Sequence, residues 1–168
     1  MFCFQCQEAA KGIACTLKGV CGKNNTTSAA MDLLLFVVRG VSVVADVLHD
    51  NGMKADNETC GFVTDALFST ITNANFDEES ILARVDKGLV LRNRLIQKAE
   101  EAGIALPKVD ELSWQGSREV YKEKAQRVGV LRETDADLRS LKELVLYGLK
   151  GMAAYHEHAM RLGYNDEA

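Results

Sequence analysis

Four of the five cysteines in this 168-residue chain lie close together near its beginning. They are Cys3, Cys6, Cys15 and Cys21, and their spacing is C-x2-C-x8-C-x5-C. Four thiolates joined by short loops can converge on one centre, and such soft ligands select zinc, copper(I) or an iron–sulfur cluster over magnesium or calcium. The pattern therefore predicts a metal or cluster site formed by these four side chains.

The uneven spacing favours an iron–sulfur cluster over a zinc ion. A structural zinc site usually combines two short C-x2-C knuckles, or one knuckle and a pair of histidines. Here five residues separate Cys15 from Cys21, and no histidine is nearby. A cluster is larger than a single ion, so wider loops between the ligands suit it. Zinc remains an open alternative.

Glycines and lysines within the cysteine run and just after it support the same interpretation. Glycines let backbone N–H groups approach cluster sulfurs, and lysines place positive charge where a cysteine-ligated cluster would carry negative charge. These residues are Gly12, Gly19, Gly22, Lys11, Lys18 and Lys23. Disulfides or free thiols are a further alternative. They are disfavoured because only Met1 and Phe2 precede Cys3, so that no secretory signal is visible and we expect a cytoplasmic protein.

The composition limits the class of protein. Hydrophobic residues make up 47% and charged residues 26% of the chain, as in ordinary globular domains. A net charge of −4 without a basic patch argues against a nucleic-acid-binding protein, and no apolar run is long enough to span a membrane. A single proline, with many Ala, Leu, Glu and Lys, predicts an all-α fold.

The hydrophobic periodicity predicts three long helices, a connector and a further long helix. The first helix is apolar on nearly every side, which predicts a central, buried position, and Gly40 within it predicts the close approach of a neighbour. Thr27 or Ser28 is the expected N-cap of this helix, and Gly52 is its expected stop. The predicted helices span residues 28–51, 58–74, 77–102, 118–128 and 135–162.

An internal repeat relates the first and last long helices. Leu33–Gly40 aligns with Leu144–Gly151, and the same register continues without a gap to Gly52 and Gly163. The repeat predicts that the last helix opens a second bundle whose partner helices would follow, so the sequence looks cut short. The predicted segments are a cluster-binding loop at 1–27, a three-helix bundle at 28–103, a connector with a short helix at 104–134, and the first helix of an incomplete second bundle at 135–168.

The remaining cysteine and the histidines carry weaker signals. Cys60 is expected to be a small buried hydrophobe or an unpaired thiol. His49 lies three residues after a carboxylate, as in di-iron bundles, but its repeat partner is Met160, so we expect an ordinary histidine at a helix end. His156 and His158 point to different faces of one helix and are predicted to be packing or surface groups.

Several stretches spread over nearly the whole chain carry a resemblance to one family. They are MFCFQCQEAAKG, TLKGVCGK, DLLLFVVRG, LFSTITNANFD and DLRSLKELVLYGLKGMAAYHEHAMRLGY, together with the cysteine spacing. In these stretches the chain resembles the hybrid cluster proteins, which are also called prismane proteins or hydroxylamine reductases. The resemblance implies that Cys3, Cys6, Cys15 and Cys21 hold a cubane [4Fe–4S] cluster, and that two three-helix bundles form the N-terminal domain.

The resemblance also implies a division of labour within a longer enzyme. In the family, a hybrid iron–sulfur–oxygen cluster reduces hydroxylamine to ammonia and is linked to nitric oxide reduction. Its His, Glu and Cys ligands come from later domains, and none of those positions is in this chain. The chain is then expected to supply the electron-entry cluster, with the remaining domains and an electron-donor protein as partners and no catalytic residue of its own. The alternative is a zinc-stabilised α-helical interaction or scaffold module without redox activity.

Overall fold

Helices form nearly all of the regular structure in the computed structural model, which describes residues 1–71 and 73–164. Within those ranges there is no strand, and the strand-like pairing is an isolated bridge between Cys3 and Cys15. The prediction of an all-α fold is therefore confirmed. The α-helices are α1 (Asn25–Asp50), α2 (Asn57–Ser69), α3 (Glu78–Glu101), α4 (Asp110–Ser113), α5 (Tyr121–Ala125) and α6 (Ala136–Arg161), and short 3-10 helices lie at Ala10–Gly12, Arg118–Val120 and Val130–Arg132.

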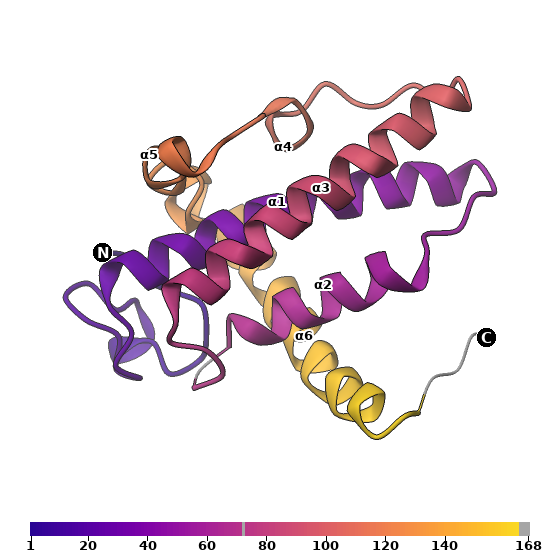
Figure 1. The fold of residues 1–168 in the computed structure, drawn as a ribbon. Helices are drawn as coiled ribbons and strands as arrows, with labels where there is room; N and C mark the ends of the chain where they lie inside the picture. The colour runs from indigo at the N-terminus through magenta and orange to yellow at the C-terminus, as the bar shows by residue number, and fades with distance from the viewer. Residues whose placement is uncertain (72, 165–168) are drawn as a thin grey trace.

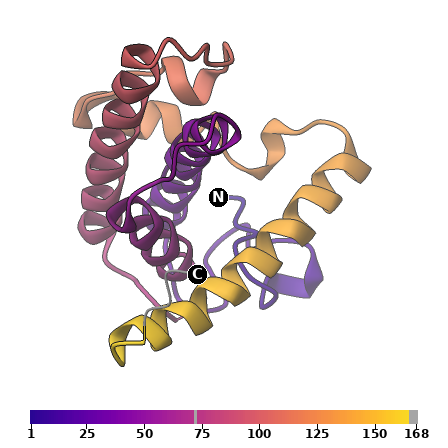
Figure 2. The same cartoon turned by 90° about the vertical axis from the view of Figure 1, so that its right-hand side faces the viewer.

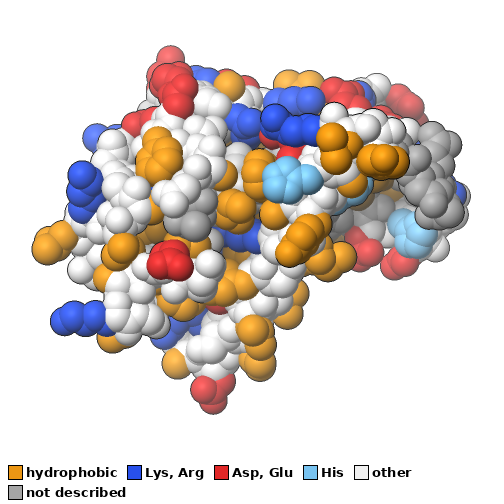
Figure 3. Space-filling view, turned by 90° about the horizontal axis from the view of Figure 1, so that it is seen from below, with side chains coloured by type: hydrophobic (Ala, Val, Ile, Leu, Met, Phe, Trp, Pro, Cys, Tyr) orange, Lys and Arg blue, Asp and Glu red, His pale blue; other side chains and the backbone are white. Residues whose placement is uncertain are grey.

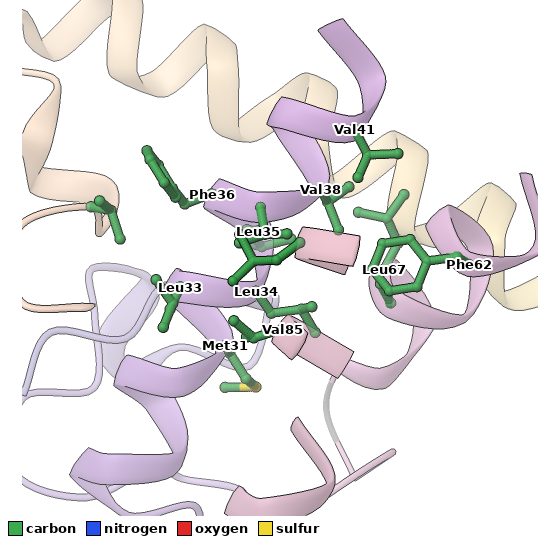
Figure 4. Packing of buried hydrophobic residues seen from close by; sticks show 14 of the residues in the cluster. Met31, Leu33, Leu34, Leu35, Phe36, Val38, Val41, Phe62, Leu67 and Val85 are labelled. Atoms are coloured by element: carbon green, nitrogen blue, oxygen red, sulfur yellow. The ribbon is translucent and has the colours of Figure 1, made fainter. Parts of the chain in front are cut away.

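The core is organised around α1, which lies along α3 and also contacts α2, α4 and α5 (Figure 1). Its predicted buried position is confirmed, since apolar side chains on several sides of α1 are removed from solvent. Figure 4 shows these side chains gathered with Val85 of α3 and with Phe62 and Leu67 of α2. Fully burying one such side chain stabilises the fold by about 1.5–3 kcal/mol. Even so, none of the described helices has the length and hydropathy needed to cross a membrane.

Helix α1 begins earlier than predicted, and its cap is Asn24. The side-chain oxygen of Asn24 accepts a hydrogen bond from the backbone N–H of Thr27 at 2.8 Å. Thr27 and Ser28 are buried within the first turn, so the prediction that either is the cap is wrong. Asn, Thr and Ser all make good caps, and the packing of this turn against the rest of the molecule decides between them.

Helix α2 ends at Ser69, before its predicted end at position 74. The hydroxyl of Thr70 donates a hydrogen bond to the carbonyl of Leu67 at 2.8 Å, and Asn73 adopts a positive φ of 58°. A side chain that binds a terminal carbonyl competes with further helical bonds, and a residue with positive φ leaves the helical path. Thr72, which belongs to the predicted helix, lies outside the described residues.

The connector between α3 and α6 is less regular than predicted. The expected helix at 118–128 is a 3-10 turn followed by the short α5, and α4 occupies a stretch that was predicted to be a loop. The guanidinium of Arg118 binds the carboxylate of Asp86 on α3 at 2.6 Å, and the hydroxyl of Tyr121 donates to the same carboxylate at 2.7 Å. The free energy of these contacts with α3 outweighs the weak intrinsic preference of residues 118–128 for one longer α-helix.

Gly40 permits the close approach that the sequence predicts. A Cβ atom at this position would lie 2.6 Å from the backbone oxygen of Glu111 in α4 and 3.1 Å from the side chain of Arg92 in α3. Arg92 is fully buried and donates a hydrogen bond to the same oxygen at 2.9 Å. The absence of a side chain at Gly40 therefore lets α1, α3 and α4 meet at one point.

Helix α6 crosses the other helices at a steep angle and packs mainly on α2 (Figures 1 and 2). Most of its apolar side chains face solvent, and hydrophobic side chains are visible at the surface in the view from below (Figure 3). The exposed ones include Leu138, Leu141, Leu144, Val145, Leu149, Met152 and Tyr155.

The domain limits at 27, 103 and 134 remain predictions, and residues 165–168 of the last predicted segment lie outside the described ranges.

Candidate metal centre

The four predicted ligands lie in a loop of residues 1–24 that precedes α1. Cys3 and Cys15 face each other in the bridge, in which the N–H of each donates to the carbonyl of the other at 3.0 and 2.9 Å. The N–H of Val20 points at the sulfur of Cys15 at 3.5 Å, and Cys21 follows in the same turn. Backbone pairing thus brings the first and third cysteines of the motif together.

Lys23 is a buried lysine that follows the last cysteine of this loop. Its side chain is 3% exposed, and its ammonium donates a hydrogen bond to the carbonyl of Ile71 at 2.9 Å. Burial lowers the pKa of Lys23, while the nearby thiols of Cys21, Cys3 and Cys6 act in the opposite direction. One cation therefore interacts electrostatically with three of the four thiols, and its compensation of cluster charge remains a prediction. Lys11 and Lys18 are exposed instead.

The surroundings of Cys3 oppose ionisation in the absence of a metal. Burial raises the pKa of its thiol, while hydrogen bonds from the Ser28 side chain and the Gln5 backbone lower it. A thiol must lose its proton to bind a metal, and the positive charge of the metal favours that loss. The hydrogen bonds toward Cys3 would then support the ligating thiolate.

Two side chains of α6 hold the Cys3–Cys6 knuckle from outside. The hydroxyl of Tyr147 lies 2.9 Å from the carbonyl oxygen of Phe4 and 3.1 Å from that of Cys6, and its ring packs on the Phe4 ring. The ammonium of Lys150 donates to the carbonyl oxygen of Gln5 at 2.9 Å and to its side-chain oxygen at 2.6 Å. Three successive carbonyls of the knuckle are therefore bound by residues one helical turn apart on α6.

The side-chain amide of Gln5 also links the cysteine loop to α1. Because its oxygen accepts from Lys150, its nitrogen donates to the carboxylate of Asp32. Burial raises the pKa of Asp32 to about 7, against opposing effects of the Gln5 hydrogen bond and Lys150. Burial lowers the pKa of Lys150 to about 8, while Glu143 and Asp32 act to raise it. The buried ammonium and the two carboxyl groups thus compensate one another.

These charged residues are related by the internal repeat. Asp32 and Glu143 occupy equivalent positions in the two copies, as do Arg39 and Lys150. All four interact electrostatically, since Asp32 and Glu143 each sense both cations. The first and last residues of α1 and α6 are equivalent in the same register. The acidic and basic positions of the two copies therefore interact electrostatically, with Arg39 on the exposed side of α1 and Lys150 buried on α6.

The four cysteines of the loop are a donor set that an iron–sulfur cluster can use. All five cysteines of the described chain are free thiols, so none is consumed in a disulfide. Within residues 1–71 and 73–164, no three His, Cys, Asp or Glu side chains converge closely enough to hold one metal ion. In a cubane each thiolate binds a different iron, so the four sulfurs need not meet at one point. Soft thiolates beside a buried cation suit that group.

The other residues considered from sequence lie away from the loop. Cys60 is exposed on α2 rather than buried, and it keeps a free thiol. His49 is exposed near the end of α1. His156 contacts the Thr64 hydroxyl through Nδ1 at 3.0 Å, and His158 packs edge-on against a phenylalanine of α2. Both α6 histidines therefore serve the packing of α6 on α2, as predicted.

Sequence reasoning did not find the residues that support the loop. Tyr147, Lys150, Gln5 and Asp32 hold it to α6 and α1, yet none carries a recognisable motif. One available signal was the polarity of Lys150, a charged residue that recurs after an apolar run in both repeat copies. The contact of α6 with a loop at the other end of the chain could not be read from local patterns.

Comparisons with known proteins find similar sequences that cover nearly the whole chain. A family model described as "Prismane/CO dehydrogenase family" matches residues 1–168. The chain is 54% identical over 164 residues to a protein named hydroxylamine reductase from Bacteroides thetaiotaomicron, and the match covers 98% of this chain and 29% of the relative. A protein of the same name from Porphyromonas gingivalis is 51% identical, with 99% of this chain and 30% of the relative covered. Another from Desulfitobacterium hafniense is 47% identical, with 100% and 31% covered. The chain spans under a third of these relatives' length, and with its cysteine loop it belongs to the Prismane/CO dehydrogenase family.

Proposed function

We propose that Cys3, Cys6, Cys15 and Cys21 hold a [4Fe–4S] cluster, and that this chain is the electron-entry part of a hydroxylamine reductase. The observation that carries the proposal is the four-cysteine loop itself, found in a chain about half identical to proteins of that name along its full length. The buried Lys23 among the thiols supports it. A redox-inactive zinc module remains the alternative.

The residues of the chain have distinct tasks in this proposal. The four thiolates bind iron, and Lys23 offsets their negative charge from inside the loop. Tyr147 and Lys150 fix the backbone of the Cys3–Cys6 knuckle, so that its two sulfurs keep their separation. When bound, a [4Fe–4S] cluster supplies uptake and release of single electrons at a potential set by charge, hydrogen bonds and solvent exposure.

In this proposal, hydroxylamine is reduced in domains of the enzyme that are not part of this chain. Reducing hydroxylamine to ammonia and water consumes two electrons and two protons, so single electrons must be supplied in succession. We propose that an electron-donor protein provides them to this part, and that hydroxylamine or nitric oxide reacts at a hybrid iron–sulfur–oxygen cluster held by the remaining domains. A cytoplasmic location, where thiols stay reduced, belongs to the same proposal. The 168-residue chain alone should show no hydroxylamine turnover.

Anaerobic purification with iron, sulfide and zinc analysis tests the proposal. We expect four irons and four sulfides per chain and an electron paramagnetic resonance signal after reduction. One zinc and no iron in anaerobic material would overturn the proposal in favour of the structural module. Turnover of hydroxylamine by the isolated chain would show that the reaction centre does not lie in the remaining domains.

A further inference from the structure

The polar face of α6 lies where it can influence the proposed cluster directly. Lys150 is 2% exposed and is bound to both oxygens of Gln5, the residue that precedes Cys6. It interacts electrostatically with the thiols of Cys3 and Cys6. A charge held this close by two hydrogen bonds, and kept from water, is screened little by salt.

Nearby groups keep this charge in place. The carboxyl group of Glu143 interacts with the ammonium from the same helix, and Asp32 is reached through the Gln5 amide. Arg39, on the exposed side of α1, is the other cation that Asp32 and Glu143 sense. Tyr147 adds a neutral hydrogen-bond donor, since burial raises its pKa and keeps its hydroxyl protonated. At the knuckle, Lys150 therefore contributes a charge as well as hydrogen bonds, whereas Tyr147 contributes hydrogen bonding alone.

We propose that Lys150 is a positioning residue of the cluster loop whose buried ammonium raises the reduction potential of the cluster, while Tyr147 holds the loop without changing its charge. The inference rests on the proposed function of the loop. Gaining an electron makes a cysteine-ligated cluster more negative, and a fixed positive charge nearby stabilises that reduced state more than the oxidised one. Glu143 acts on the same equilibrium in the opposite direction.

The test is a spectroscopic redox titration of the anaerobically purified chain at pH 7, where most of the Lys150 side chains carry their charge. In Lys150→Met, which keeps the length of the side chain and removes the charge, we expect the equilibrium constant for reduction to fall about tenfold or more, a shift of about 59 mV to lower potential for one electron. Lys150→Arg keeps the positive charge and should have a reduction potential near that of the wild type. Lys142→Met is the matched control, because Lys142 is exposed on the same helix and pairs with Glu133.

Two further variants separate an electrostatic role from a purely structural one. Glu143→Gln should shift the potential upward, opposite to Lys150→Met, and it decides the question if the methionine variant loses its cluster. Tyr147→Phe should release iron to a chelator several-fold faster while shifting the potential less than Lys150→Met does. Potentials unchanged in both charge variants, or shifted in the same direction, would overturn the inference. Absence of iron in the wild-type chain would instead overturn the proposed function.

Discussion

Helices α1 and α6 have related sequences and equal length, yet they bury opposite sides. In α1 the apolar side chains form the core, and Arg39 and Asp46 face solvent. In α6 the buried positions include Glu143, Lys150 and Glu157, and most of the large apolar side chains are exposed. The repeat thus specifies a helix and its ends, whereas the neighbours decide which side is covered. The polar side of α6 is the one that reaches the cysteine loop.

Truncation of equivalent leucines should show this contrast most strongly. Leu33 and Leu144 occupy the same position in the two copies, but Leu33 is fully buried and Leu144 is 68% exposed. Leu33→Ala should lower the free energy of unfolding by about 2–5 kcal/mol because it leaves a cavity in the core. Leu144→Ala should change it by about 0.5 kcal/mol or less. Urea unfolding at matched iron content measures both, and equal losses would refute the assigned burial of α6.

The two equivalent glycines should respond with opposite signs. Gly40→Ala would place a Cβ against the Glu111 backbone and should destabilise the chain by about 1–3 kcal/mol. Apart from the neighbouring backbone of α6 itself, no described atom lies within 4 Å of a Cβ placed at Gly151, so Gly151→Ala should stabilise α6 by up to about 1 kcal/mol. Thermal unfolding of the two variants gives the comparison. A stabilised Gly40→Ala chain would mean that α1 and α4 do not approach as described.

The carboxyl group of Asp32 in α1 should make the free energy of unfolding depend on pH. The pKa of Asp32 is raised to about 7 in the folded chain, so the folded state binds more protons than the unfolded state between about pH 4 and 7. Stability therefore falls as the pH rises through this range, by an amount on the order of 1–2 kcal/mol between pH 5 and 7. Asp32→Asn should show a smaller fall in urea unfolding at several pH values. Parallel pH profiles for the two chains would count against the burial of this carboxyl group.

Much of the fold follows from the sequence because its signals are local. The apolar run of the first helix and Gly52 after α1 act within a few residues, and so does Asp77, whose side chain caps α3 by accepting a hydrogen bond from the backbone N–H of Glu79. The errors arise where distant contacts decide, as at Arg118, which α3 holds in a 3-10 turn. At the site, the cysteines and lysines are visible in the sequence as a spaced motif.

The support of the loop could not be predicted in the same way. Tyr147 and Lys150 act on Phe4, Gln5 and Cys6, and this contact exists only after α6 has packed across the molecule. In an amphipathic helix viewed alone, a lysine among leucines indicates the solvent side. Here that side is covered by the loop, so the usual interpretation places Lys150 on the wrong face.

We propose that the N-terminal cysteine loop, and no other thiol of this chain, binds iron. The most direct test is the iron content of anaerobically purified Cys6→Ser beside Cys60→Ser, with the wild-type chain as reference. Cys6 belongs to the knuckle held by α6, whereas Cys60 is an exposed free thiol on α2. We predict that Cys6→Ser loses the cluster and its reduced-state resonance, and that Cys60→Ser keeps both at the wild-type level. An unchanged iron content and spectrum in Cys6→Ser would show that Cys6 is not a ligand of the cluster.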